Sequence, residues 1–400
     1  MKHVALLGCG VVGGGIAAIM RDNAAYLEKS VGEPVELKYI LELRDCSGEP
    51  WADKVIQDFT IIETDPEISV VAECIGGCGV AFEFVKRALR AGKSVVTCNK
   101  QLVAEHGLEL LELAKQQHVF LLFEASVGGG IPLLRPLTNC LSANRIDAVY
   151  GIVNGTTNYI LTQMIACGQD FDSALRDAQR LGYAEADPTA DVDGLDAMRK
   201  ICILADLCFG SNLPPERVQV EGIRGVTLSD AANADALGYA VKLLARTERV
   251  EGERFTAFVA PHLVKKGTLL ADVDGVMNAV AVRGNAVGEC LFYGAGAGRM
   301  PTASAMVADI IDTFRRGDGR KFIDWGPEQP ERWAEPEALP CRWYARYRGE
   351  AGDAVMERCM ARGAERAGIT SAMTRKALQS ALAASGAELL QSFRVLESAD

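Results

Sequence analysis

The chain has 400 residues, a length typical of two or three domains. Hydrophobic residues make up 49% and charged residues 24%, which excludes a disordered chain, a collagen-like chain and a bundle of membrane spans. The formal net charge of −11 repels phosphate backbones and anionic lipid, so we expect neither a nucleic-acid nor a membrane partner. Glycine is unusually frequent, with 40 residues against the usual ~7% of a chain, and the glycines lie in clusters.

Short β-branched runs alternate with helical patterns over the first third of the chain. The predicted strands are His3 to Leu7, Val35 to Glu42, Ile61 to Ile62, Val70 to Cys74, Ser94 to Thr97 and Val119 to Phe123. Strands that alternate with helices of this length predict βαβ units and a parallel sheet covered on both faces. We therefore predict a doubly wound α/β domain over residues 1–130, to which residues 299–320 return.

A glycine pattern GxGxxG falls at Gly8, Gly10 and Gly13, directly after the first predicted strand and at the start of a helix. Gly8 permits the tight turn, Gly10 lets the backbone approach a pyrophosphate, and Gly13 allows close packing of helix on strand. The phosphates would lie on the free amides of the first helical turn, which includes Val11 and Val12. This context favours a Rossmann-type dinucleotide site over a structural turn.

The end of the second predicted strand should select the cofactor. Glu42 or Asp45 fits a ribose 2′-hydroxyl and therefore NAD, whereas Arg44 fits a 2′-phosphate, and we favour NADP on Arg44. Gly76 lies in a glycine turn after another strand, at the edge of the sheet that faces the ligand. Lys100 follows a further strand end, so it is a candidate for contacting cofactor or substrate.

From about Ile131 longer helical patterns appear, followed by strand-like segments, which predicts a second, α+β domain over residues 131–298. A later glycine cluster, YGAGAGRMP, then leads into a helix. Residues 321–340 are rich in Arg, Gly, Pro and Glu and are predicted to be a linker. The remaining residues, 341–400, contain two strand patterns around a helical patch and predict a small α+β appendix.

The densest chemistry lies within residues 181–200. Four carboxylates crowd a proline-containing loop there, namely those of Glu185, Asp187, Asp191 and Asp193. In the helix that follows, Asp196 and Lys200 are four residues apart and share a face. Such a pair is usually solvated, but the apolar residues after it predict a buried helix, in which a lysine held by an aspartate suits proton transfer. Hydride transfer between an alcohol and nicotinamide needs such a group, and the surplus of acid suits a substrate ammonium.

Twelve cysteines are scattered through apolar runs without a CxxC pair. The nearest approach, Cys74 and Cys78, has no histidine close in the sequence, so neither a zinc site nor a disulfide framework is predicted. We expect buried, reduced thiols and therefore a reducing, cytoplasmic location.

With these motifs in place, the chain resembles homoserine dehydrogenase. The stretches that carry the resemblance include GCGVVGGG, TCNKQLVAEHG, FEASVGGGIPLLRPL, GIVNGTTNYILTQM, GYAEADPTADVDGLDAMRKICILA and YGAGAGRMPTASAMVADI. It implies the reversible, NAD(P)-dependent interconversion of L-homoserine and L-aspartate 4-semialdehyde, a step toward threonine, methionine and isoleucine. The alternatives are a related dehydrogenase of another small amino-acid aldehyde and a non-catalytic nucleotide-sensing protein of the same fold.

The resemblance also implies roles for individual residues. Lys200 matches the proton-donating lysine, and Lys100 matches a second lysine that contacts cofactor and substrate. The implied substrate-binding residues are Thr156, Glu185, Asp191 and Asp196. The implied cofactor contacts beyond the first glycine turn are Gly182, Glu185, Gly296 and Gly298. The implied ligands of a sodium ion are Glu124, Val127, Gly129 and Ile131, because oxygen ligands suit a hard cation.

By the same resemblance the protein is a homodimer or a higher homo-oligomer, with the sheet of the second domain at the interface. Residues 341–400 are loosely similar to a shortened, degenerate ACT regulatory domain.

Overall fold

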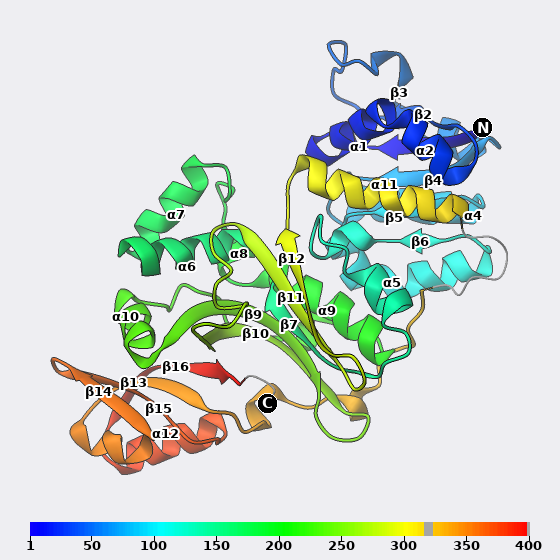
Figure 1. Cartoon of the computed structure of the whole chain (residues 1–400). Helices are drawn as coiled ribbons and strands as arrows, with labels where there is room; N and C mark the ends of the chain where they lie inside the picture. Colours follow the sequence, from blue (N-terminus) through cyan, green and yellow to red (C-terminus); the bar gives the residue numbers. More distant parts are fainter. Residues whose placement is uncertain (316–322, 398–400) are drawn as a thin grey trace.

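The computed structural model describes residues 1–315 and 323–397. Residues 316–320 of the predicted returning segment, 321–322 of the predicted linker and 398–400 of the appendix lie outside the described residues. The N-terminal sheet and the C-terminal unit lie at opposite ends of the molecule, and a second sheet lies between them (Figure 1).

The N-terminal sheet is parallel and has the strand order β3-β2-β1-β4-β5-β6. Its strands are β1 (Lys2–Leu7), β2 (Val35–Leu41), β3 (Val55–Ile56), β4 (Ile68–Glu73), β5 (Ser94–Thr97) and β6 (Leu121–Leu122). Its helices are α1 (Val11–Asp22), α2 (Ala24–Val31), α3 (Phe59–Thr64), α4 (Gly79–Arg90), α5 (Lys100–Gln116) and, from far along the chain, α11 (Arg299–Arg315). The order reverses between β1 and β4, which creates the crevice where doubly wound sheets bind dinucleotides.

Helices cover both faces of this sheet, as the alternation of its buried residues requires. Leu6 of β1 packs with α1 and α11, whereas Leu7 packs on the opposite face with α4 and α5. Helices α1 and α11 cross closely, because a Cβ atom on Gly15 would lie 2.8 Å from the Arg299 carbonyl oxygen. The prediction of a doubly wound α/β fold is therefore confirmed.

One predicted strand is wrong. Ile61 and Ile62 lie within α3, a short helix that the Asp58 side chain caps by accepting a hydrogen bond from the Thr60 N–H at 2.8 Å. Ile62 is fully buried and Ile61 is exposed, so the β-branched pair packs as part of an amphipathic turn.

The second sheet begins with the order β12-β11-β7-β9-β10. Its strands are β7 (Ile146–Ile152), β9 (Tyr239–Arg249), β10 (Phe255–Lys265), β11 (Met277–Gly284) and β12 (Gly288–Ala295), with the short β8 (Gln219–Val220) beside β10. The associated helices are α6 (Gly155–Cys167), α7 (Phe171–Arg180), α8 (Thr189–Val192), α9 (Leu195–Phe209) and α10 (Leu228–Leu237). Ile201 and Leu204 of α9 belong to the same buried cluster as Val149 of β7, so α9 covers one face of this sheet.

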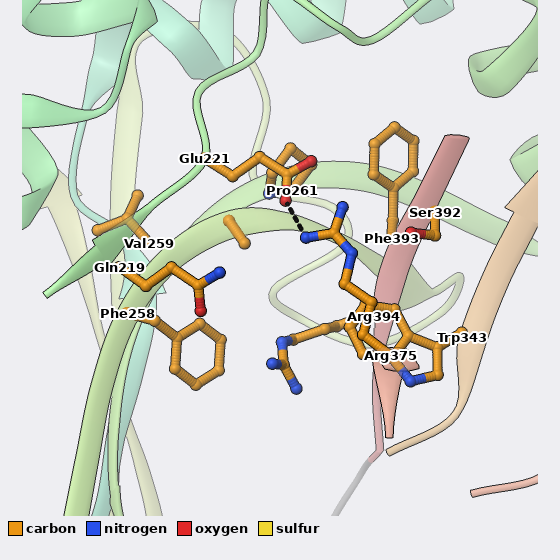
Figure 2. Close-up of a pocket in the computed structure, with 11 residues that line it drawn as sticks. Gln219, Glu221, Phe258, Val259, Pro261, Trp343, Arg375, Ser392, Phe393 and Arg394 are labelled. Carbon is orange, nitrogen blue, oxygen red and sulfur yellow. Dashed lines mark hydrogen bonds and ion pairs between the residues drawn. The ribbon is translucent and has the colours of Figure 1, made fainter. Parts of the chain in front are cut away.

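The C-terminal unit extends the second sheet instead of standing apart from it. It contains β13 (Trp343–Arg348), β14 (Arg358–Arg362), β15 (Glu365–Ile369), α12 (Arg375–Ala384) and β16 (Glu388–Leu396). Strand β16 pairs in parallel with β10, and the order continues as β16-β13-β15-β14. Arg375 of α12 pairs with Glu221 across this junction at 3.2 Å (Figure 2). An α+β appendix was expected here, but its pairing with β10 was not.

Candidate active site

The first glycine turn has the geometry that a dinucleotide pyrophosphate requires. Gly8 has a φ of +87°, and a Cβ atom on Gly13 would lie 2.1 Å from the Gly8 carbonyl oxygen. Helix α1 starts at Val11 after Gly10, without a side-chain cap, and Val11 is 70% exposed. Its first-turn amides are therefore available to an anion, and the turn fits the predicted cofactor.

Glu42 and Arg44 meet beside this turn. An Arg44 guanidinium nitrogen lies 2.6 Å from a Glu42 carboxylate oxygen and 4.0 Å from where a Cβ atom on Gly10 would lie. The same Glu42 oxygen accepts the Cys9 N–H at 2.9 Å. The bond from Arg44, helped by backbone N–H groups, outweighs burial and lowers the pKa of Glu42 to about 2. Asp45 is exposed and accepts a bond from the backbone N–H of Ser47.

Two buried polar side chains that were not among the predicted site residues, Glu73 and Asn99, hold the second glycine turn. Glu73, at the end of β4, accepts N–H groups from Ile75 and Gly76 at 2.7 and 3.2 Å. Asn99 caps α5 and donates its side-chain N–H to the Gly77 carbonyl at 2.6 Å. Asparagine directly before a helix is a common cap, so Asn99 carried a sequence signal. Together they fix Gly76 next to the start of α5.

A carboxylate between two lysines forms the centre of the site. Lys200 and Asp196, both on α9, are 7% and 3% exposed, and their charged atoms lie 2.7 Å apart. Lys200 also donates to the Val153 carbonyl at 2.5 Å. Lys100, the first residue of α5, forms an ion pair with the other Asp196 oxygen, and its side chain is 40% exposed. The predicted pair is therefore a triad that joins the two domains.

The environment shifts the pKa values of the two lysines in opposite directions. Burial and the neighbouring Lys100 lower the pKa of Lys200, although Asp196 acts in the opposite direction. Burial also acts to lower the pKa of Lys100, but the Asp196 carboxylate outweighs it and raises that pKa. Despite its own burial, Asp196 has a pKa well below the usual range because both lysines face it. Lys200 thus releases its proton more readily than an ordinary lysine does.

Asn154 links the triad to a further predicted residue. Its side-chain amide donates to Asp191 at 2.7 Å and to Asp196 at 2.9 Å, while its oxygen caps α6 by accepting the Thr157 N–H. Burial raises the pKa of Asp191, although the bond from Asn154 opposes the rise. Asn154 was not predicted as a site residue, and its signal was an asparagine at the cap of a predicted helix.

The loop before α8 borders this cluster. The Thr156 hydroxyl donates to the Tyr183 carbonyl at 2.6 Å, which attaches the loop to the start of α6. Gly182 has a φ of +76° and is exposed, as is Glu185, whose backbone carbonyl accepts a bond from Gln179. Lys100, Asp191, Asp196 and Lys200 are thus brought together directly or through Asn154, and Glu185 lies on the adjoining loop.

The predicted cation loop packs against the late glycine turn. A Cβ atom on Gly129 would lie 2.4 Å from the Gly296 carbonyl oxygen, and Val127 and Ile131 are buried. The neighbouring Gly298 has a φ of +121°. The Glu124 carboxylate accepts three backbone N–H groups, from Leu133, Leu134 and Arg135, at 2.5 to 2.9 Å. Burial nevertheless raises the pKa of Glu124.

Comparisons with known proteins show the family of this chain. The sequence model "Homoserine dehydrogenase" matches residues 132–311, and the model "Homoserine dehydrogenase, NAD binding domain" matches residues 8–124. A homoserine dehydrogenase of Neisseria gonorrhoeae is 45% identical over 316 residues, which are 78% of this chain and 72% of that protein. The chain belongs to the homoserine dehydrogenase family. That assignment confirms the resemblance and the class of NAD(P)-dependent oxidoreductase.

Solved homoserine dehydrogenases share the architecture. The crystal structure of one from Thiobacillus denitrificans has a TM-score of 0.90 at 36% identity and covers 99% of this chain and 98% of its own. A hyperthermophilic archaeal homoserine dehydrogenase in complex with NADPH has a TM-score of 0.67 at 29% identity, covering 80% of this chain. Within the part of this chain that the structure describes, no helix has the length and apolar composition needed to cross a membrane.

Proposed function

We propose that the protein interconverts L-homoserine and L-aspartate 4-semialdehyde with a nicotinamide cofactor, in the route to threonine, methionine and isoleucine. The observation that carries this proposal is the buried Lys200, held by Asp196 and Val153 where α9 meets the dinucleotide-binding domain. A lysine with a lowered pKa at this position suits an alcohol-aldehyde interconversion, in which one oxygen must gain or lose a proton.

A nicotinamide cofactor, when bound, would supply the hydride for the reacting carbon or accept it from that carbon. In the reducing direction, the Lys200 ammonium donates a proton to the aldehyde oxygen as that oxygen gains negative charge. In the oxidising direction, neutral Lys200 takes the proton from the homoserine hydroxyl. Asp196 and the Val153 carbonyl hold the Lys200 nitrogen in one orientation for both directions.

The acidic side chains around the triad are proposed to bind the substrate ammonium. Asp191, Asp196 and Glu185 supply negative charge, and Thr156 supplies a hydroxyl beside them. Lys100 is less buried than Lys200 and is proposed to contact both substrate and cofactor. The late glycines Gly296 and Gly298 and the exposed Gly182 are proposed to contact the cofactor.

A sodium ion is proposed in the Glu124 to Ile131 loop. The donor set is all oxygen, which suits a hard cation. Because the Glu124 carboxylate already accepts three N–H groups, we propose that the carbonyl oxygens of Val127, Gly129 and Ile131 are the main ligands and that Glu124 orders the loop.

Three broader proposals concern the cofactor, the assembly and the domain organisation. NADP is favoured over NAD because the Arg44 guanidinium lies beside the glycine turn. A cytoplasmic homodimer or higher homo-oligomer, assembled through the second sheet, remains our expectation. The division into residues 1–130 with 299–320, 131–298, a 321–340 linker and an ACT-like 341–400 also remains a proposal.

Steady-state assays with aspartate semialdehyde and homoserine test the function. Lys200→Ala should lower kcat by about 10²- to 10⁴-fold in both directions while NADPH still binds. Lys115→Ala is the matched control, because Lys115 is a surface lysine paired with Asp324. A wild-type enzyme that turns over another amino-acid aldehyde better would favour the related-dehydrogenase alternative, and cofactor binding without turnover would favour a sensor.

A further inference from the structure

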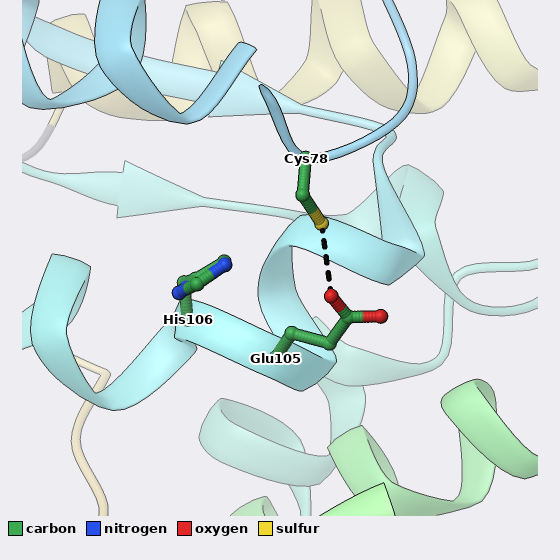
Figure 3. A group of neighbouring side chains, drawn as sticks. All are labelled: Cys78, Glu105 and His106. Carbon is green, nitrogen blue, oxygen red and sulfur yellow. Dashed lines mark hydrogen bonds between the residues drawn. The ribbon is translucent and has the colours of Figure 1, made fainter. Parts of the chain in front are cut away.

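A cysteine, a glutamate and a histidine meet where the start of α4 packs against α5. Cys78 is the residue before α4, and Glu105 and His106 are consecutive on α5. The sulfur of Cys78, a carboxylate oxygen of Glu105 and an imidazole nitrogen of His106 all lie within 4.8 Å of one another (Figure 3). The sequence does not predict such a group, because His106 is distant from Cys78 along the chain.

The packing of α4 on α5 creates this arrangement and fixes which side chains face each other. Three pairs face each other along the two helices: Cys78 with Glu105 at 3.2 Å, Phe82 stacked on His106 with ring centroids 4.2 Å apart, and Lys86 with Glu109 at 2.7 Å. Residues 78, 82 and 86 are spaced four apart and share one helix face. The stacking on Phe82 limits the orientations of the His106 ring.

We propose that Cys78, Glu105 and His106 form a binding site for a zinc-like divalent cation. Thiolate and imidazole bind zinc in preference to harder cations such as magnesium or calcium. The Glu105 carboxylate is the third protein ligand, and a water molecule can take the fourth position. Tetrahedral zinc places its ligand atoms about 3.4 to 3.7 Å apart, given its bond lengths. Side-chain rotations that move the ligand atoms of Cys78, Glu105 and His106 by roughly an ångström would therefore bring them to these distances.

Binding requires a proton to leave the site. In the present arrangement the Cys78 thiol donates to Glu105, and burial together with that bond raises the pKa of Cys78 to about 12, against the effect of the positive charge of Arg199. The metal must displace the thiol proton, so its affinity should increase with pH. The metal would connect the glycine turn before Cys78 to α5, two segments that we predict to line the cofactor crevice.

Metal titrations of the full-length, reduced protein test the site. Wild-type protein should bind one Co²⁺ with a thiolate-to-cobalt charge-transfer band, and Zn²⁺ should displace it. Cys78→Ser should abolish the band and weaken Zn²⁺ binding at least tenfold, and His106→Gln should weaken it similarly. Glu109→Gln, one turn farther along α5, is the matched control and should leave binding unchanged.

Serine is a favourable helix cap, so Cys78→Ser should fold, which circular dichroism and NADPH binding check independently. Cys140→Ser controls for metal capture by an exposed thiol elsewhere. A band of equal intensity in Cys78→Ser, or Zn²⁺ affinity unaffected by both Cys78→Ser and His106→Gln, would overturn the proposal.

Discussion

At the scale of single residues, the site depends on one carboxylate that serves two lysines. Asp196 is buried, so its negative charge acts strongly on both Lys100 and Lys200. Of the two lysines, the more buried Lys200 loses its proton more readily, because its pKa is lowered whereas that of Lys100 is raised. The sequence predicted the Asp196–Lys200 pair from helical spacing alone. It did not predict that Lys100 shares Asp196, because that contact depends on how α5 packs against α9.

The pH dependence of turnover should report this arrangement. Homoserine oxidation needs neutral Lys200, so its kcat should rise as pH increases through the pKa of Lys200, and semialdehyde reduction should show the opposite trend. Asp196→Asn removes the negative charge that acts to raise the pKa of Lys200. The rise of kcat for oxidation and the fall of kcat for reduction should therefore both move to lower pH. Asp193→Asn, three residues earlier in the chain and paired with Arg224, is the control. An unmoved pH dependence in Asp196→Asn would contradict the role of Lys200.

Cofactor choice is a second residue-scale question, because Arg44 is engaged by Glu42. If Arg44 holds a 2′-phosphate, Arg44→Ala should lower kcat/KM for NADPH about tenfold, the effect of losing one hydrogen bond to a charged group of about 1.5 kcal/mol. The kcat/KM for NADH should change little. Arg21→Ala, at the other end of α1, is the control. Equal losses with both cofactors would place Arg44 on a part that NADPH and NADH share.

At the scale of elements, features formed by neighbouring residues in the chain were predicted better than contacts between segments far apart in the chain. The strand-turn-helix that begins at β1 was predicted because its glycines and its hydrophobic run are adjacent in the chain. The α3 segment was predicted wrongly, since a β-branched pair is compatible with either a strand or a buried turn until a cap such as Asp58 is considered. Cys78 and His106 meet through helix packing, which periodicity does not reveal.

Neighbouring glycines in α1 provide a sharp test at this scale. A Cβ atom on Gly13 would meet the Gly8 backbone oxygen at 2.1 Å, so Gly13→Ala should abolish NADPH binding or folding. On Gly14 the nearest atoms would lie 3.5 Å and 3.6 Å away, which is ordinary contact. Gly14→Ala should therefore bind NADPH normally and gain up to about 1 kcal/mol of helix propensity. Fluorescence titration with NADPH and thermal unfolding measure both, and normal binding by Gly13→Ala would refute the turn geometry.

At the scale of the whole molecule, one continuous sheet joins the substrate region to the C-terminal unit. Strand β16 is the last strand in the chain, yet it pairs with β10 of the second sheet and separates it from β13. Composition and pattern predict a linker over residues 321–340 and a small α+β appendix, but they do not indicate how either packs. In the structure, Trp325 within the predicted linker is 3% exposed and packs edge-on against Phe123, so this segment contributes to the core. Pairings between strands so distant in the chain leave no local sequence pattern.

The buried Arg394 of β16 should therefore be essential to this junction. Its guanidinium lies 4.7 Å from the ring centroids of both Phe258 and Trp343 and donates to the Pro336 carbonyl at 2.7 Å. Arg394→Ala removes these contacts and leaves a cavity between β10 and the C-terminal unit, which should lower the free energy of unfolding by about 2 to 4 kcal/mol. Denaturant unfolding measures the loss, and limited proteolysis should show faster cleavage near residues 323–340. Arg358→Ala, on the exposed edge strand β14, should change neither. If Arg394→Ala were as stable and as protease-resistant as Arg358→Ala, the C-terminal unit would be held to the second sheet by backbone pairing alone.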